Sequence, residues 1–279
     1  MGHTTVGRRA QVARLTTPQR DGFWAQGWLH VPGALSAKAC DAISADMWER
    51  FEASGRERTG EFMALPVFQL DRRYADVVDN PAVIGLVAGL LGEGIRAMST
   101  QYVIRFPGPG PEVWHADGAR QPDGSPGYPE CIQPSSLLQL KVAYALNDLT
   151  GEGSGMTRFV PGSHRLASAA VGGYRDGAEP PGAVGPPLAK GDAVLFHQSL
   201  WHRGANVTRA EPRLTLFYGY CHVWMRPFDY DERDVDASTW EALTPVHRSL
   251  LRPRDASSGI GAYYFTPDNS LSDLLEAGS

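Results

Sequence analysis

"DAVLFHQSLWHRGANVTRAEPRLTLFYGY", residues 192–220, decides the fold expected for this chain. Two short apolar runs, "DAVLFH" and "RLTLFYGY", flank a polar stretch that carries Gly-Ala-Asn and Glu-Pro turn signals. Short runs of this kind between turn signals predict strands. Comparable runs lie upstream, at "RAMSTQYVIRF" (96–106), "SSLLQLKVAYAL" (135–146) and "MTRFV" (156–160). Many short strands separated by Pro-Gly-rich turns favour an antiparallel sandwich or barrel.

The chain before residue 95 predicts helices instead. In "LSAKACDAISADMWERFE" (35–52), apolar side chains recur at every fourth position, which places them on one face of a helix, and Ser36 is a suitable N-cap. An earlier helix is expected to begin with Thr17 as its N-cap and Pro18 at the first helical position. We therefore expect one domain over 1–279, with a mainly helical front at 1–94, a β core at 95–225 and a C-terminal extension at 226–279.

Composition excludes several classes of partner. The net charge is −5, and the 26 Lys and Arg residues form no long run, so nucleic acid is not an expected partner. The longest apolar stretch, "AVIGLVAGLL" (82–91), is too short to span a bilayer, and no membrane association is expected. Three cysteines lie far apart, as is usual in a reducing compartment. These features predict a cytoplasmic protein.

The first candidate site residues occur in "EVWHADGARQ" (112–121). His115 and Asp117 are two apart, so on an extended chain they point to the same side and can hold one object together. By itself the His-x-Asp pattern is common by chance. His202, which follows a predicted strand and precedes the Gly-Ala-Asn turn, supplies a second imidazole. Two histidines and one carboxylate on a face, with other positions open, are typical of non-haem Fe(II) oxygenases.

An arginine completes this pattern. Arg213 begins the strand after His202, eleven residues further along the chain. Its planar guanidinium pairs bidentately with a carboxylate, and it is therefore expected to grip the far end of a dicarboxylic acid. His197 is a rival for the distal metal ligand. It lies inside the apolar run "DAVLFH", whereas His202 heads a turn, and His202 is the preferred ligand.

With these residues in place, the chain resembles the phytanoyl-CoA dioxygenase-like (PhyH) branch of the Fe(II)/2-oxoglutarate-dependent oxygenases. The similarity covers most of the chain and is carried by "GWLHVPGALSAKACDAI" (27–43), "YVIRFPGPGPEVWHAD" (102–117), "VAYALNDLTGEGSGMTRFVPGSHR" (142–165) and "KGDAVLFHQSLWHRGANVTRAEPRLTLFYGY" (190–220). It implies a mainly β fold with flanking helices, built on a double-stranded β-helix core of the jelly-roll or cupin-like type. It also implies Fe(II) bound by His115, Asp117 and His202, Arg213 on the distal carboxylate of 2-oxoglutarate, and dioxygen as oxidant.

Other contacts to the co-substrate follow from the resemblance and from strand alternation. The family lines its co-substrate pocket with polar side chains at comparable strand positions, which makes Gln101 and Lys141 candidates. The alternative for both is a solvent-facing strand edge. Thr215 faces the same way as Arg213 and is either a carboxylate partner or a core residue. The loop-rich segments 118–136 and 171–188 are interpreted as a lid over a small molecule.

The activity implied is oxidation of a C–H bond of a small molecule, with hydroxylation as the expected outcome and tailoring of a secondary metabolite as the expected role. Desaturation, epimerisation and ring closure are alternative outcomes of the same cofactor chemistry. Asp117 argues against a halogenase, whose halide takes the place of the carboxylate. A cupin-like metal-binding protein without oxygenase activity is a further alternative. The sequence does not predict the substrate or the oligomeric state.

Overall fold

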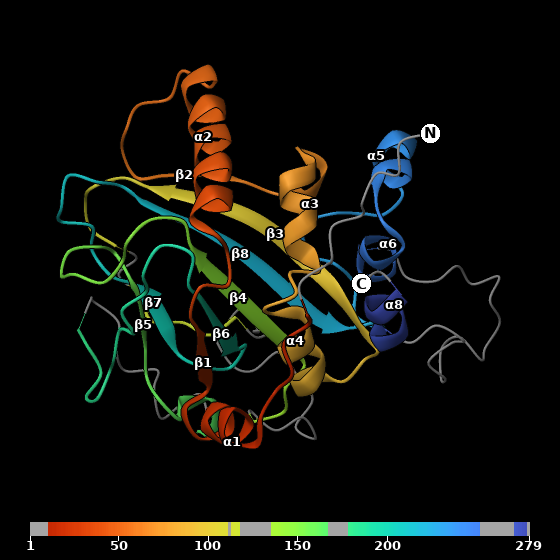
Figure 1. The fold of residues 1–279 in the computed structure, drawn as a ribbon. Coiled ribbons are helices and arrows are strands. Elements are labelled where there is room, and N and C mark those ends of the chain that lie inside the picture. The colour runs from red at the N-terminus through yellow and green to blue at the C-terminus, as the bar shows by residue number, and fades with distance from the viewer. Residues whose placement is uncertain (1–10, 111–112, 118–134, 167–177, 252–270, 278–279) are drawn as a thin grey trace.

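A computed structural model describes residues 11–110, 113–117, 135–166, 178–251 and 271–277 of the protein. Its centre is a six-stranded sheet in which every neighbouring pair is antiparallel. In spatial order, the strands are β1 (Trp28–Val31), β6 (Ala193–His197), β4 (Gln139–Ala145), β8 (Arg213–His222), β3 (Ile95–Arg105) and β2 (Glu61–Ala64). Figure 1 shows the long strands β3 and β8 side by side through the middle of the molecule.

A smaller layer faces this sheet. It consists of β5 (Thr157–Phe159) paired antiparallel with β7 (His202–Gly204). Isolated bridges extend the layer, and one of them joins His115 to His202. A further bridge joins Phe159 to Val184. The two layers make the protein mainly β, as predicted from the pattern of short strands.

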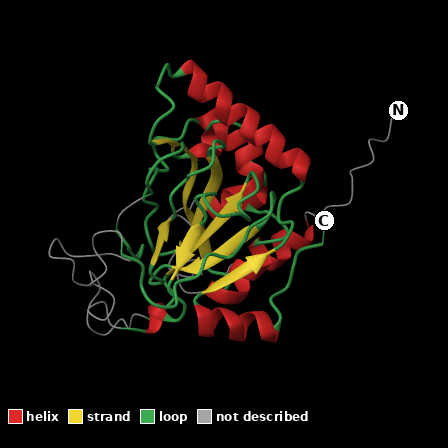
Figure 2. Ribbon diagram, turned by 90° about the vertical axis from the view of Figure 1, so that its left-hand side faces the viewer, coloured by secondary structure: helices red, strands yellow, loops and turns green. Residues whose placement is uncertain are grey.

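The helices cover the other side of the large sheet. Figure 2 shows the strands in the middle of the molecule and helices around them, chiefly along one side. The helices are α1 (Thr17–Gln26), α2 (Ala37–Ala53), α3 (Arg72–Val78), α4 (Ile84–Leu91), α5 (Ala237–Ala242), α6 (Pro245–Leu251) and α8 (Leu271–Ala277), with 3₁₀ turns η1 (Val67–Gln69) and η2 (Ser163–Arg165). This arrangement confirms the expected flanking helices.

Helix N-termini follow the predicted caps with one correction. Ser36 caps α2 by accepting a hydrogen bond from the Ala39 N–H, as expected. For α1, the cap is Thr16 rather than Thr17. Thr16 accepts from the Gln19 N–H, and the Gln19 side chain accepts from the Thr16 N–H, so the capping box selects Thr16. Gln19, three residues after the cap, was the signal for this register.

Strand alternation divides the large sheet into two faces. On β8, Leu216, Tyr218 and Tyr220 belong to the main hydrophobic core, which also contains residues of α2, α3, α4 and α6. The Tyr218 hydroxyl donates to the Tyr74 carbonyl at 2.7 Å, and the Tyr220 hydroxyl donates to the Val78 carbonyl at 2.8 Å. These bonds fasten α3 to the sheet. The alternate positions of β8 therefore face inward, toward β5 and β7.

The front and the C-terminal extension are both joined to the central sheet. The front supplies two edge strands, because β1 pairs with β6 and β2 pairs with β3. In the extension, the Tyr230 hydroxyl lies within hydrogen-bond distance of the Ala97 and Leu251 carbonyl oxygens, at 2.9 and 2.7 Å. Arg96 on β3 also pairs with Glu232. No helix in the described ranges has the length and apolar character needed to cross a membrane.

Candidate active site

Three predicted ligands converge between the two layers. One ligand atom from each of His115, Asp117 and His202 can be chosen so that all three lie within 4.8 Å of one another. Nε2 of His115 lies 3.9 Å from Oδ1 of Asp117, and Nε2 of His202 lies 3.7 Å from Oδ2. Two imidazoles and one carboxylate thus face a common point, and this donor set suits ferrous iron.

Backbone hydrogen bonds fix the positions of these residues. The His115 N–H donates to the His202 carbonyl at 3.0 Å, and the His202 N–H donates to the His115 carbonyl at 2.8 Å. The Asp117 N–H donates to the Gln198 carbonyl at 2.7 Å. A segment more than 80 residues away from His202 in sequence is thereby held in strand-like register beside β7. The site is built into the sheet.

The histidines present the nitrogens that a metal needs. Nδ1 of His202 lies 2.8 Å from the Leu200 carbonyl oxygen, and Nδ1 of His115 lies 3.3 Å from the Val113 carbonyl oxygen. A carbonyl only accepts, so each Nδ1 carries the proton and each Nε2 offers a lone pair. Burial lowers the pKa of His202 to about 4, against the opposing influence of Asp117. The His202 imidazole is therefore neutral at physiological pH.

Asp117 is ionised in this setting. Burial raises its pKa, but the Lys141 ammonium and then His202 outweigh burial and bring the pKa to about 2. Nζ of Lys141 lies 2.9 Å from Oδ2 of Asp117. A carboxylate beside the neutral His202 imidazole has the protonation state that divalent metal binding requires.

Arg213 is a buried cation with neutral partners. Its Nε donates to the Thr215 hydroxyl at 2.8 Å, Nη1 donates to the Gly155 carbonyl at 2.7 Å, and Nη2 donates to the Thr157 hydroxyl at 3.0 Å. A guanidinium has five N–H donors, so two remain, one on each terminal nitrogen. Within the described ranges, no carboxylate forms an ion pair with it. Burial, then Arg105, lowers the pKa of Arg213 to about 10, and it stays charged at neutral pH.

Lys141 and Gln101 both lie on the inner face of the sheet. Gln101 is half-buried on β3 and is paired in register with Phe217 on β8. Lys141, on β4, contacts Asp117 and lies 5.6 Å from the centre of the Phe217 ring. Arg213 lies at the same distance from that ring. The Phe217 ring thus lies between Lys141, which is beside Asp117, and Arg213 at the start of β8.

His197 lies away from the cluster. It belongs to β6 with its ring packed against Phe23, Trp24 and His164. Burial, followed by the proximity of His164, lowers its pKa to about 4. The structure places His202 beside His115 and Asp117, and it places His197 on the opposite face of the sheet. Alternation along "DAVLFH" accounts for this orientation.

Several residues that shape the site were not predicted from the sequence. Gly155 and Thr157 hold the Arg213 guanidinium, and the Gln198 carbonyl holds the Asp117 backbone. Thr215, by contrast, was named from the sequence as a carboxylate partner or a core residue, and it also holds Arg213. Gly155 and Thr157 come from a separate segment, so no local pattern points to Arg213.

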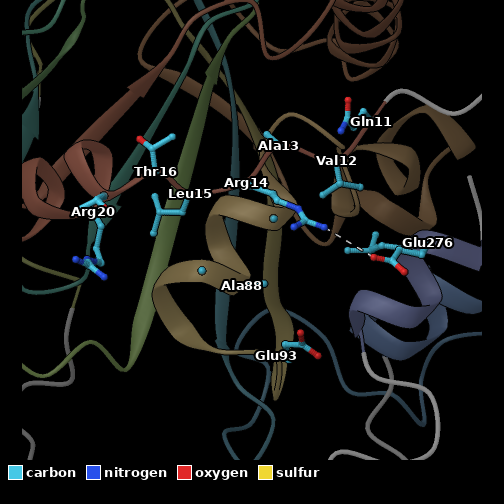
Figure 3. A pocket seen from close by; sticks show the side chains of 14 residues that line it. Gln11, Val12, Ala13, Arg14, Leu15, Thr16, Arg20, Ala88, Glu93 and Glu276 are labelled. Carbon is cyan, nitrogen blue, oxygen red and sulfur yellow. Dashed lines mark ion pairs between the residues drawn. The ribbon is translucent and has the colours of Figure 1, made fainter.

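A large cavity lies elsewhere. This pocket of about 940 Å³ is partly open to solvent and is lined by residues 11–17, Arg20, α4, Glu93 and α8 (Figure 3). Arg14 points across it toward Glu276, with Nη2 and Oε1 3.9 Å apart and both side chains exposed. Its described lining includes none of the predicted site residues, and α4 packs on the outer face of the sheet. This cavity is separate from the His115–Asp117–His202 cluster.

Comparison with known proteins supplies the family. The model of the family "Phytanoyl-CoA dioxygenase (PhyH)" matches residues 23–215. The chain is 29% identical over 245 residues to "Dioxygenase af480" of Aspergillus fumigatus, covering 81% of this chain and 73% of the relative. This match is consistent with the dioxygenase class predicted from the sequence.

Two solved structures share the fold. HygX from Streptomyces hygroscopicus, crystallised with nickel and 2-oxoglutarate, superposes with a TM-score of 0.62 at 18% identity, covering 81% of this chain and 95% of HygX. SnoK, a non-haem α-ketoglutarate-dependent carbocyclase from nogalamycin biosynthesis, superposes with a TM-score of 0.61 at 23% identity, covering 86% and 95%. The jelly-roll core predicted from the sequence is confirmed. Because the family model matches well over half of the chain, the protein belongs to the phytanoyl-CoA dioxygenase (PhyH) family and is a dioxygenase.

Proposed function

We propose that the protein is an Fe(II)/2-oxoglutarate-dependent dioxygenase in which His115, Asp117 and His202 hold the metal. The observation that carries this proposal is the convergence of one nitrogen from each histidine and one carboxylate oxygen within 4.8 Å of one another. Three protein ligands leave open positions for a chelating keto acid and for dioxygen. The cofactors are Fe(II) and 2-oxoglutarate, with dioxygen as the oxidant.

Arg213 is the proposed anchor for the distal carboxylate of 2-oxoglutarate. It is 6% exposed, and its contacts are two hydroxyls and one carbonyl. A buried guanidinium is favourable when an anion pairs with it, and its two remaining N–H groups match the two oxygens of a carboxylate. Phe217, between Arg213 and Lys141, gives the carbon chain of the diacid an apolar surface.

The bound iron and keto acid supply the oxidising power for attack on a C–H bond, and the protein supplies placement. His115 and His202 hold their rings through Nδ1–H bonds to backbone carbonyls, so the metal position is set by the sheet. Arg213 orients the diacid from its far end. Buried Phe196 and half-buried Phe217 line the inner face with apolar surface that keeps water away.

The proposed reaction is hydroxylation of a small molecule in natural-product biosynthesis. The similarity to SnoK, named as a carbocyclase, supports ring closure as an alternative outcome for the same site. Desaturation and epimerisation remain further alternatives. Asp117 argues against halogenation, because its carboxylate takes the position that halide needs. All of these outcomes depend on the proposed metal site formed by His115, Asp117 and His202.

The test measures oxygen-dependent formation of succinate from 2-oxoglutarate with Fe(II) present, across a panel of candidate small molecules. The proposal expects succinate formation that depends on Fe(II) and is abolished in His115→Ala. His30→Gln is the matched control, because His30 pairs with Asp192 at the sheet edge. A protein that binds metal but forms no succinate with any candidate supports the alternative of a cupin-like binding protein.

A further inference from the structure

Lysine is scarce in this chain. The sequence contains three lysines and 23 arginines, which together make the 26 basic residues. Lys38 is exposed, and Lys190 pairs with Asp41 at the surface. Lys141 differs from both, because it lies on the inner face of β4 with its side chain 22% exposed. A lysine has therefore been placed beside the proposed metal site in a chain that uses arginine almost everywhere else.

The closest contact of Lys141 is with one carboxylate oxygen of Asp117. Nζ lies 2.9 Å from Oδ2 of Asp117, while Oδ1 faces Nε2 of His115 at 3.9 Å. An ammonium is a compact point charge, and it binds a single oxygen well. A guanidinium at the same place would grip both oxygens through its planar fork. A lysine at position 141 thus leaves the other carboxylate oxygen of Asp117 available to a metal.

The surroundings direct the ammonium to Asp117. Across the strand pairs, the residues in register with Lys141 are Phe196 on β6 and Gly219 on β8. The Phe217 ring lies 5.6 Å from Nζ. Among the described residues, Asp117 is the acid with which Lys141 forms an ion pair. Within the described ranges, the cross-strand neighbours of Lys141 supply no second carboxylate for the ammonium.

The number of ligand positions at the metal makes this contact consequential. Ferrous iron has about six positions, of which two histidines and one carboxylate oxygen occupy three. A chelating keto acid needs two more, and dioxygen needs the last. If both oxygens of Asp117 were bound to the metal, one of these positions would be lost.

We propose that Lys141 is a positioning residue that restricts Asp117 to one metal-binding oxygen and so keeps a position free for 2-oxoglutarate. This inference rests on the proposed function. It differs from the expectation that Lys141 contacts the co-substrate, since the ammonium acts here through Asp117. This role depends on the contact of the ammonium with a single oxygen of Asp117. An arginine keeps the positive charge but binds through a planar fork, so it is not expected to replace Lys141.

The test compares Lys141→Met and Lys141→Arg with the unaltered protein, using Mn(II) as a metal that does not turn over. Lys190→Met is the matched control, since Lys190 is also paired with a carboxylate but lies at the surface. Calorimetry gives the dissociation constants of Mn(II) and of 2-oxoglutarate for each protein. Crystals of the Mn(II) forms show whether Asp117 uses one oxygen or two. Thermal unfolding checks that each variant is folded.

For Lys141→Met, we expect Asp117 to bind Mn(II) through both oxygens and the dissociation constant of 2-oxoglutarate to rise about tenfold or more. Its Mn(II) dissociation constant is expected to change by less than about tenfold. In Lys141→Arg, the fork is expected to hold both oxygens, so that Mn(II) binding itself weakens. Lys190→Met is expected to match the unaltered protein throughout.

Two results would overturn the inference while leaving the proposed function standing. One is one-oxygen binding by Asp117 with unchanged 2-oxoglutarate affinity in Lys141→Met. The other is weakened 2-oxoglutarate binding with one-oxygen coordination retained, which would mean that Lys141 contacts the diacid directly. Failure of the unaltered protein to bind Mn(II) at His115, Asp117 and His202 would overturn both proposals together.

Discussion

His115 and His202 are joined through their backbones by two hydrogen bonds, of 3.0 and 2.8 Å, and their ring centres lie 4.3 Å apart. The register of a strand-like pair therefore sets the distance between the two imidazoles. A hydrogen bond from the Asp117 N–H to the Gln198 carbonyl places Asp117 on the same side. Because backbone hydrogen bonds hold these residues, each side chain can be replaced without removing the bonds that position the other two.

Replacing His115 with alanine is expected to remove metal binding and leave the fold intact. The side chain of His115 is 43% exposed, so its loss is expected to change the free energy of unfolding by only about 0.5 kcal/mol. The measurement pairs a Co(II) titration with thermal unfolding of the same sample. Normal Co(II) affinity in the variant would exclude His115 as a ligand, and a collapsed fold would make the substitution uninformative about chemistry.

Replacing Arg213 with lysine is expected to weaken 2-oxoglutarate binding by about 10- to 100-fold, which corresponds to one charge-assisted hydrogen bond or more. Lysine keeps the positive charge but lacks the fork that engages both carboxylate oxygens. Metal affinity is expected to stay unchanged, because Arg213 contacts Gly155, Thr157 and Thr215 and none of the ligands. Calorimetry on the Mn(II)-loaded protein separates the two affinities, and equal 2-oxoglutarate affinity in both proteins would refute the assignment.

Acid is expected to destabilise the metal-free protein, in part through His197. Burial, and then His164, lowers the pKa of His197 from 6.5 to about 4. Between these values the unfolded chain binds a proton that the folded chain does not. The contribution of His197 to the free energy of unfolding is therefore complete above pH 6.5. It is lost as the pH falls toward 4, with a slope of up to about 1.4 kcal/mol per pH unit.

The measurement for this prediction is urea unfolding of metal-free protein at pH 7 and pH 5. His197→Phe keeps a ring against Phe23 and Trp24 but has no titrating group, so the drop in stability between the two pH values is expected to be smaller. His202, whose pKa is lowered to about 4 chiefly by burial, contributes in the same direction in both proteins. An identical drop in the variant would show that His197 is not responsible.

Removing the Tyr218 hydroxyl tests how α3 is fastened to the sheet. Tyr218→Phe leaves the buried Tyr74 carbonyl without its donor, which is expected to lower the free energy of unfolding by about 1–3 kcal/mol. The ring of Tyr218 lies on the outer face, so Mn(II) affinity is expected to stay the same. Chemical denaturation and a Mn(II) titration check both statements, and a loss of metal affinity would mean that the two faces are coupled.

The strands and the placement of the candidate ligands were predictable from local pattern. Alternation put Arg213 and Thr215 on one face, and the same rule put His115 and Asp117 on one side of their segment. The position of His202 at a turn, and that of His197 inside a strand, favoured His202 as the ligand, and His202 rather than His197 lies beside His115 and Asp117. These inferences succeed because a strand has a fixed period of two residues, so residue spacing alone gives the direction of each side chain.

Contacts between distant segments were not predictable in the same way. Lys141 was expected to line the co-substrate pocket, and its contact with Asp117 depends on how β4 lies beside the segment 113–117. Gly155 and Thr157 reach Arg213 only because β5 folds across the inner face of the large sheet. The predicted N-cap of α1, Thr17, was wrong by one residue, because Gln19 forms the capping box with Thr16. The lid assigned to 118–136 and 171–188 lies largely outside the described residues.

One measurement tests the central claim most directly: a crystal soaked with Fe(II) and 2-oxoglutarate without oxygen. We predict iron bound by Nε2 of His115, Nε2 of His202 and one oxygen of Asp117, with the distal carboxylate of the diacid on Arg213. Iron at any other place, or a 2-oxoglutarate carboxylate that leaves Arg213 untouched, would contradict the account.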